Sequence, residues 1–153
     1  MNILSGKNIV LGITGSIAAY KAADIASKLK KEGCNTKIVM TKSAESFITR
    51  TTLESLSLNP VLIDGDDSSH VANFTHLELA KWADILLIAP CTANFMNKLA
   101  NGHGDDLLST ICLAYTKDIF IAPAMNPDMW ENKITQNNLK KLSSSDIKIF
   151  FPL

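Results

Sequence analysis

The stretch that decides the fold is residues 119–130, which read IFIAPAMNPDMW. The first four residues are apolar and predict a buried β-strand, which a proline-bounded loop ends. In open α/β folds, loops that follow the strands place side chains at the carboxyl edge of the sheet, where ligands bind. The amide, two thioethers and indole of residues 123–130 suit a flat, partly apolar ligand with a polar end. An ordinary turn before a short helix is the alternative interpretation.

Strand patterns alternate with helical patterns along the whole chain. Strands are expected at 8–13, 36–40, 60–63, 85–89, 119–122 and 147–151, and helices at 16–31, 44–50, 52–58, 77–82, 93–100, 106–114 and 130–142. Gly33 is expected to end the first helix in the left-handed conformation. Residues 64–74 lack periodicity and are expected to form a mobile surface loop. The alternation predicts an α/β fold of three layers, a doubly wound parallel sheet in a single domain.

Composition limits the classes of function. The chain has 153 residues, 46% of them apolar, which is enough for one domain with a real core. Lys+Arg and Asp+Glu each total 15, so there is no basic field to attract nucleic acid or an anionic membrane. No stretch approaches the roughly 20 apolar residues of a membrane span, and the N-terminus predicts a strand rather than a signal peptide. Three cysteines without a close pair argue against a disulfide framework and zinc, and favour a cytoplasmic protein.

The turn after the first strand, residues 12–21, reads GITGSIAAYK and is a candidate phosphate-binding element. Its backbone amides lie at a helix start, and the hydroxyl groups of Thr14 and Ser16 are expected to add donors. The turn lacks the GxGxxG fingerprint, and the second strand ends in MTKS without the acidic residue that holds an adenosine ribose. NAD is therefore disfavoured and a mononucleotide remains plausible. Tight packing of helix on strand without a ligand is the alternative.

Two further segments carry polar groups beside predicted strand ends. Residues 89–95 read APCTANF, in which Thr92 or Asn94 can cap a helix or hydrogen-bond a heterocycle or phosphate. His76 is expected at a helix start beside a cleft, where an imidazole could exchange protons near neutral pH. A surface or capping role is the alternative for this histidine. The paired acids at 105–106 are explained by the dipole of the helix that they precede.

Four segments together resemble the homo-oligomeric flavin-containing cysteine decarboxylase family, and the resemblance covers essentially the whole chain. They are GITGSIAAYK (12–21), HLELAKWAD (76–84), APCTANFMNKLANGHGDDLLST (89–110) and PAMNPDMW (123–130), in the family's order and spacing. The resemblance implies a flavodoxin-like fold, bound FMN, and homotrimers or assemblies of trimers with the flavin near a subunit interface. The most similar branch decarboxylates phosphopantothenoylcysteine in coenzyme A biosynthesis and is often fused to a synthetase, the phosphopantothenate–cysteine ligase.

The resemblance also implies roles for individual residues. His76 corresponds to the family's active-site histidine, and Asn126 corresponds to its substrate-binding asparagine. The implied chemistry is oxidation of the cysteine moiety by FMN to a thioaldehyde, followed by decarboxylation to an enethiolate. The implied FMN contacts all follow predicted strands: Gly15, Ser16, Ile17, Thr41, Ser43, Thr92, Ala93, Asn94, Phe95, Ala124 and Met125.

One part of the family pattern is not matched. The pantothenoyl branch continues into a flap whose cysteine helps to reduce the enethiolate, and none of Cys34, Cys91 and Cys112 matches that cysteine. Residues 1–153 are therefore interpreted as one FMN-binding decarboxylase domain without the flap, expected to stall after decarboxylation. The alternatives are a peptidyl-cysteine decarboxylase that forms an enethiol, a flavin prenyltransferase, and a non-catalytic FMN-binding or regulatory subunit.

Overall fold

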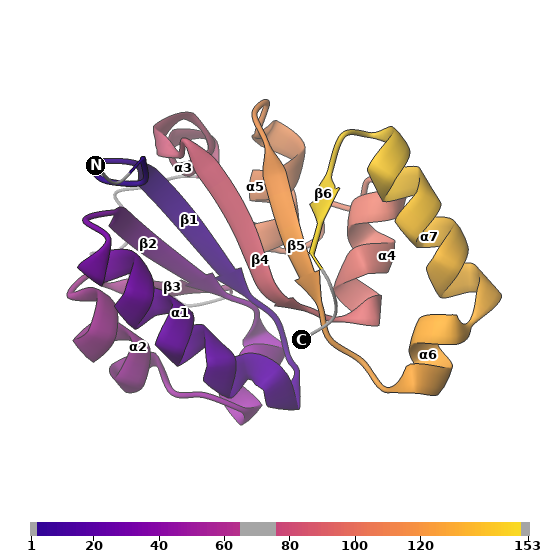
Figure 1. Ribbon diagram of the computed structural model, residues 1–153, viewed down its shortest axis with the longest axis horizontal. Helices are drawn as coiled ribbons and strands as arrows, with labels where there is room; N and C mark the ends of the chain where they lie inside the picture. The colour runs from indigo at the N-terminus through magenta and orange to yellow at the C-terminus, as the bar shows by residue number, and fades with distance from the viewer. Residues whose placement is uncertain (1–2, 65–75, 151–153) are drawn as a thin grey trace.

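The computed structural model describes residues 3–64 and 76–150, and within them six strands form one parallel sheet (Figure 1). The strands are β1 (Asn8–Ile13), β2 (Asn35–Met40), β3 (Val61–Ile63), β4 (Ile85–Cys91), β5 (Ile119–Pro123) and β6 (Lys148–Ile149). Their order is β3-β2-β1-β4-β5-β6, so the winding direction reverses between β1 and β4. The doubly wound parallel sheet expected from the sequence is confirmed. In detail, the order is 3-2-1-4-5-6, where flavodoxin itself has 2-1-3-4-5.

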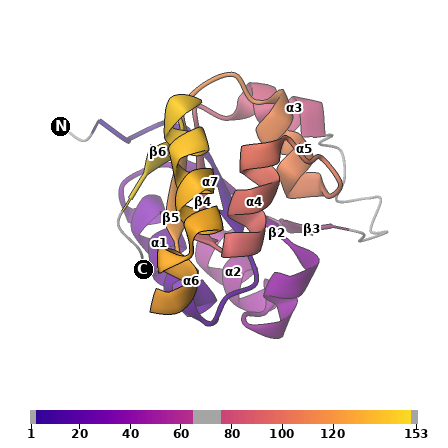
Figure 2. The same cartoon turned by 90° about the vertical axis from the view of Figure 1, so that its right-hand side faces the viewer.

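Helices cover both faces of the sheet and complete three layers (Figures 1 and 2). One face carries α1 (Tyr20–Lys31) and α2 (Arg50–Ser57), which pack against each other. On the other face α3 packs against α5, α5 against α4 and α4 against α7. Their bounds are His76–Trp82 for α3, Ala93–Asn101 for α4, Leu107–Ala114 for α5 and Lys133–Ser144 for α7. The short α6 (Pro127–Glu131) lies beyond the carboxyl ends of the strands.

Residues of the central strands alternate between two cores. In β1, Val10 belongs to the core under α3, α4, α5 and α7, whereas Leu11 and Ile13 belong to the core under α1 and α2. In β2, Val39 and Met40 divide in the same way. All five side chains are fully buried. Successive side chains of a strand point to opposite faces of the sheet. An unbroken run of apolar residues therefore predicts a strand that is buried on both faces, as these strands are.

The expected helix over 16–31 does not begin as an α-helix. Its first turn is a 3₁₀ helix, η1 (Ile17–Ala19), and α1 starts only at Tyr20. The reason is that the Ser16 hydroxyl accepts a hydrogen bond from the Ala18 amide at 3.1 Å, which caps the tighter turn. The helix ends as predicted, because Gly33 follows its C-cap with φ of 83°.

The single helix expected over 130–142 is wrong, because two helices, α6 and α7, occupy this region. Pro127 starts α6 early, in a first-turn position where its missing N–H costs nothing. Asn132 then takes a non-helical backbone conformation, and its side chain accepts a hydrogen bond from the Ile134 amide at 2.8 Å. A capping asparagine between two helical runs therefore divides them.

A similar cap shortens the helix expected over 44–50. The chain there forms the 3₁₀ helix η2 (Lys42–Ser46), and Thr49 is extended and caps α2 through a 3.2 Å bond from the Thr52 amide. The remaining elements begin and end within two residues of the expected bounds. The loop predicted at 64–74 lies outside the described residues except for Asp64. No helix within 3–64 and 76–150 has the length and apolar character needed to cross a membrane.

Candidate functional site

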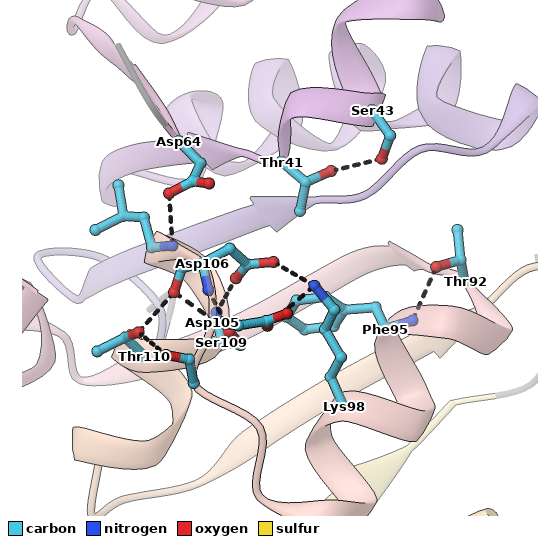
Figure 3. A network of polar contacts seen from close by, with 12 residues as sticks. Thr41, Ser43, Asp64, Thr92, Phe95, Lys98, Asp105, Asp106, Ser109 and Thr110 are labelled. Atoms are coloured by element: carbon cyan, nitrogen blue, oxygen red, sulfur yellow. Dashed lines mark hydrogen bonds and ion pairs between the residues drawn. The ribbon is translucent and has the colours of Figure 1, made fainter. Parts of the chain in front are cut away.

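Loops that follow β1, β2, β3 and β4 meet at the carboxyl edge of the sheet and enclose a cavity of about 270 Å³. Five of the residues predicted as cofactor contacts line it together: Thr41, Ser43, Thr92, Asn94 and Phe95. The cavity also has lining residues that the sequence did not single out as ligand-binding: Lys42, Asp64, Lys98, Asp105 and Asp106. Figure 3 shows most of these side chains converging from the strand ends and from the starts of α4 and α5.

Thr14 joins the loop after β1 to the end of β4 and the residue that follows it. Its hydroxyl donates a hydrogen bond of 2.6 Å to the Pro90 carbonyl and accepts one of 3.1 Å from the Thr92 amide. Its own amide donates to the Pro90 carbonyl as well, at 3.3 Å. The side chain is only 2% exposed. The single hydroxyl proton is therefore in use, and the expectation that Thr14 adds a phosphate donor is wrong.

Gly15 brings the same loop against the end of β2. A Cβ at this position would lie 2.5 Å from Ser43 Oγ and 2.7 Å from Ser43 Cβ, closer than real Cβ contacts. The Ser43 hydroxyl is in turn 3.2 Å from that of Thr41. The glycine is thus needed for close approach, and the turn and the end of the second strand form one surface.

Unused backbone donors remain in this turn. The amide of Ser16 bonds to Thr14 and that of Ala18 bonds to the Ser16 hydroxyl, whereas those of Gly15 and Ile17 find no acceptor among the residues described. The Ser16 hydroxyl accepts in its bond, so its proton is still available. Two amides and one hydroxyl beside an exposed serine at position 43 suit an anion such as a phosphate.

The segment after β4 is fixed by its own cap. The Thr92 hydroxyl accepts a hydrogen bond of 3.1 Å from the Phe95 amide and so begins α4, one of the two caps proposed from the sequence. Ala93 is half-buried, Asn94 is exposed, and the Phe95 ring is only 2% exposed. Asn94 can therefore offer its amide to a ligand, whereas the Phe95 side chain serves mainly the core.

An ion-pair network forms one wall of the cavity (Figure 3). Lys98 Nζ lies 2.8 Å from Asp106 Oδ2 and 3.1 Å from Asp105 Oδ1. Asp106 also caps α5, because its Oδ1 accepts a hydrogen bond of 2.7 Å from the Ser109 amide. Asp64, at the end of β3, accepts a 2.8 Å bond from the Leu107 amide. These contacts fasten α4, α5 and β3 to one another.

The two partners of this network hold each other ionised. Burial alone would raise the pKa of Asp106, but hydrogen bonds from Lys98 and Ser109 outweigh it and leave the pKa below its ordinary value. The hydrogen bond to Asp106, opposed by burial and helped by Asp105, raises the pKa of Lys98. The wall therefore keeps both signs of charge at neutral pH.

The residues after β5 continue the same edge. The Ala124 amide donates a 3.0 Å hydrogen bond to the carbonyl of Cys91, so this strand end lies against that of β4. Ala124 is buried, and Met125 is half-buried against the core. Asn126 is exposed and caps α6, since its Oδ1 accepts from the Met129 amide at 2.8 Å. No partner for its Nδ2 exists among residues 3–64 and 76–150, so this donor is free for a ligand.

His76 and Asn126 are not brought together in one chain. His76 is the half-buried first residue of α3, and neither residue lines the cavity. In both views α3 lies toward the amino ends of the strands, whereas α6 lies past their carboxyl ends (Figures 1 and 2). The catalytic pair implied by the resemblance is therefore separated within the monomer.

None of the three cysteines offers a reactive thiol at this edge. Burial raises the pKa of both Cys91 and Cys112, and Cys91 is entirely inaccessible. Cys34 precedes β2 at the opposite edge of the sheet, where its thiol donates to the Leu4 carbonyl at 3.4 Å. The active groups of the site are therefore hydroxyls, amides and charged side chains.

Sequence signals for the missed lining residues can be identified. Lys98 follows Asn94 by four residues on one helix, and that spacing places both on the same face. Asp64 directly follows β3, as Thr41 follows β2. In the sequence, the dipole of the following helix is enough to explain the acids at 105 and 106, and it indicates no side-chain partner for them. No local pattern in the sequence indicates that they contact Lys98.

Comparison with known proteins agrees with the fold. The chain is 45% identical over 152 residues to the coenzyme A biosynthesis bifunctional protein CoaBC of Vibrio vulnificus strain YJ016. The matched region covers 99% of this chain and 38% of that relative. It thus spans less than half the length of such relatives.

Two solved structures resemble this fold. For the FMN-dependent cysteine decarboxylase SpaF, the TM-score is 0.89 at 30% identity, over 97% of this chain and 85% of the other. For a PPC decarboxylase mutant complexed with pantothenoylaminoethenethiol, it is 0.80 at 33% identity, over 95% and 81%. The family model described as Flavoprotein matches residues 2–153. The chain therefore belongs to the Flavoprotein family.

Proposed function

We propose that this chain binds FMN and decarboxylates phosphopantothenoylcysteine in coenzyme A biosynthesis. The observation that carries the proposal is the carboxyl-edge cavity, where the predicted contacts Thr41, Ser43, Thr92 and Asn94 converge in a chain 45% identical to a CoaBC protein. The CoaBC relatives are named bifunctional, so we propose that a phosphopantothenate–cysteine ligase activity accompanies this domain, fused or separate, in the cytoplasm.

The residues of the edge fit FMN. The free amides of Gly15 and Ile17 and the hydroxyls of Ser16 and Ser43 suit a phosphate monoester. Farther along the edge, Ala124 and Met125 present small and apolar groups beside the polar Thr92–Asn94 segment, which suits one side of an isoalloxazine ring. The turn lacks the GxGxxG motif that holds a diphosphate, so we expect FAD to bind poorly.

Within this proposal, each residue has a limited task. Bound FMN would supply the two-electron oxidation of the cysteine moiety that precedes loss of the carboxylate. Asn126 would hold the substrate carboxylate or amide through its free Nδ2, while its Oδ1 stays bound to the Met129 amide. His76 would transfer a proton at its imidazole, a role typically worth about 10² to 10⁴ in rate.

The separation of α3 from α6 supports a shared site. If His76 and Asn126 act on one substrate molecule, they come from different subunits, because their helices lie toward different ends of one chain (Figures 1 and 2). We therefore propose a homo-oligomer, a trimer or an assembly of trimers, in which a neighbouring subunit closes the cleft. Sedimentation would contradict this if a monomer held FMN tightly.

A second candidate is decarboxylation of another cysteine carboxylate, such as that of a peptide, to an enethiol. The TM-score of 0.89 to the cysteine decarboxylase SpaF favours it. Assay of carbon dioxide release from phosphopantothenoylcysteine and from a peptide with a C-terminal cysteine separates the candidates, since they differ in the substrate that is decarboxylated. A protein that releases carbon dioxide only from a cysteine peptide would contradict the first candidate.

The test of the proposal begins with the purified protein. We expect it to be yellow and to release FMN on denaturation; an apoprotein that takes up NAD and refuses FMN would contradict the proposal. His76→Asn should retain FMN and lose about 10² to 10⁴ in the rate of carbon dioxide release. His103→Asn is the matched control, because His103 is exposed between α4 and α5. Equal rates in both variants would assign His76 a structural role only.

A further inference from the structure

We propose that Thr14 is a positioning residue of the flavin site. Its hydroxyl joins the loop after β1 to the end of β4, where the winding direction of the sheet reverses, and so fixes the shape of the site. The inference rests on the proposed FMN binding. Thr14 lines the cavity, but its hydroxyl is assigned no hydrogen bond to the ligand, because it donates its proton to the Pro90 carbonyl at 2.6 Å and accepts from the Thr92 amide at 3.1 Å.

The position of Thr14 in the sheet explains why one hydroxyl can have this effect. β1 and β4 are neighbours, yet their ladder pairing runs only from Ile9 opposite Ile85 to Gly12 opposite Ile88. Beyond that point the strands are joined by the Thr14 amide and hydroxyl, which bond to residues 76 and 78 positions away in sequence. These bonds replace the ladder at the place where an open sheet parts to admit a ligand.

Each side of the Thr14 linkage leads directly to a proposed flavin contact. On one side the next residue is Gly15, whose backbone approaches Ser43 so closely that no Cβ fits between them. On the other side Thr92 caps α4 through the Phe95 amide and so orients Asn94 at the cavity. The distance between the phosphate-binding turn and the start of α4 is thus set by Thr14.

The chain offers a matched control for loss of this hydroxyl. Thr36 lies on β2 and is 3% exposed, against 2% for Thr14, and its hydroxyl has no hydrogen-bond partner in the described residues. Thr→Val removes a buried hydroxyl at either position with nearly the same side-chain shape. Only at position 14 does the change break the linkage between loops, so the two variants differ in the property under test.

The experiment compares FMN dissociation constants of the parent, Thr14→Val, Thr14→Ser and Thr36→Val, measured by flavin fluorescence on proteins shown to be folded. We expect Thr14→Val to raise Kd about 10-fold or more, the size of a lost buried hydrogen bond. Thr14→Ser keeps the hydroxyl and should stay within about twofold of the parent, as should Thr36→Val. A Thr14→Val protein with the parent Kd, or a Thr14→Ser protein as impaired as Thr14→Val, would overturn the inference.

A second measurement separates this inference from the proposed function. Hydrogen exchange of the Thr92 amide reports the bond to Thr14 without any flavin, and it should become faster in Thr14→Val but not in Thr36→Val. Unchanged protection in Thr14→Val would overturn the positioning role. If the parent binds no FMN, the proposed function fails, while faster exchange in Thr14→Val would still support the linkage. If Thr14→Val does not fold, Thr14→Ser decides by its Kd and its Thr92 exchange.

Discussion

The turn after β1 and the segment after β5 both belong to the proposed flavin site, and they are held in different ways. Thr14 bonds to the loop after β4 across 76 and 78 residues of sequence, and Gly15 packs against Ser43 after β2. We call these joined loops, residues 14–16, 41–43 and 90–92, the linked edge. Asn126 instead bonds to Met129, three residues along. Residues 125–130 are the self-capped segment.

The difference shows two ways of placing functional groups. In the linked edge, each loop holds its neighbour, so one substitution is expected to change the shape that a cofactor meets. In the self-capped segment, the geometry of Asn126 follows from a short helix that carries its own cap and Pro127 at its first position. Chemistry at Asn126 should therefore be separable from cofactor binding, whereas changes in the linked edge should appear first in FMN affinity.

Asn126→Ser should have the largest effect of these tests, on catalysis alone. Serine still caps a helix but lacks the free Nδ2, so we expect about 10- to 100-fold slower carbon dioxide release with FMN affinity and stability nearly unchanged. Asn132→Ser is the matched control, since the Asn132 side chain caps α7 through a bond of the same length, 2.8 Å. Parallel loss of FMN in Asn126→Ser would show that the two regions are not separable.

Gly15→Ala should act in the opposite way and lower FMN affinity about 10-fold. The added methyl group would meet Ser43 Oγ at 2.5 Å and the Ser43 backbone carbon at 3.0 Å, so the linked edge must shift. Titration of apoprotein with FMN measures the change. Gly104→Ala is the control: the one close contact of its Cβ is with the tip of exposed Leu113 at 2.8 Å, which can move. Equal affinity in the two variants would contradict the role of the close approach.

Asp106→Asn tests the ion-pair wall of the cavity. Asparagine retains the cap on α5 but loses the ion pair to Lys98, so we expect a loss of about 1–2 kcal/mol in the free energy of unfolding at pH 7. Asp105→Asn is the control: the Asp105 side chain is 62% exposed, so this change should alter the free energy of unfolding by less than about 0.5 kcal/mol.

The pH dependence of this loss has a definite sign. The pKa of Asp106 is lowered in the folded protein, so its stabilisation is present above the unfolded pKa of about 3.9 and is lost as pH falls through the folded pKa. Urea unfolding of parent and Asp106→Asn should converge in acid. A difference that persists unchanged below both pKa values would contradict the ionic origin.

Leu58→Gly should have the smallest effect and no effect on the site. Leu58 ends α2 with φ of 55°, a left-handed conformation that costs a leucine free energy, and its side chain is 69% exposed. We expect about 0.5–1 kcal/mol greater stability in thermal unfolding with the parent Kd for FMN. A change in FMN affinity here would show that the linked edge is sensitive to distant regions.

Sequence patterns were sufficient for the sheet, whereas the list of edge residues rested mostly on the family resemblance and lacked Lys42, Asp64 and Lys98. Unbroken apolar runs predicted the strands, and Gly33 predicted the end of the first helix. Both predictions are confirmed, because these signals are local in the chain. The single helix over 130–142 was wrong for an equally local reason, a capping Asn132 that was not recognised. The roles of His76 and Asn126 remain predictions.

Only the tertiary structure decided what each edge residue can do. The sequence places a hydroxyl at Thr14 but not its partners, and the fold turns an expected phosphate donor into a linkage to Pro90 and Thr92. It likewise joins Lys98 to Asp106, from the body of one helix to the cap of the next. Hydrogen bonds and ion pairs depend on distances of about 3 Å between groups far apart in the chain. Local preference determines the elements, whereas those distances exist only after the strands have paired.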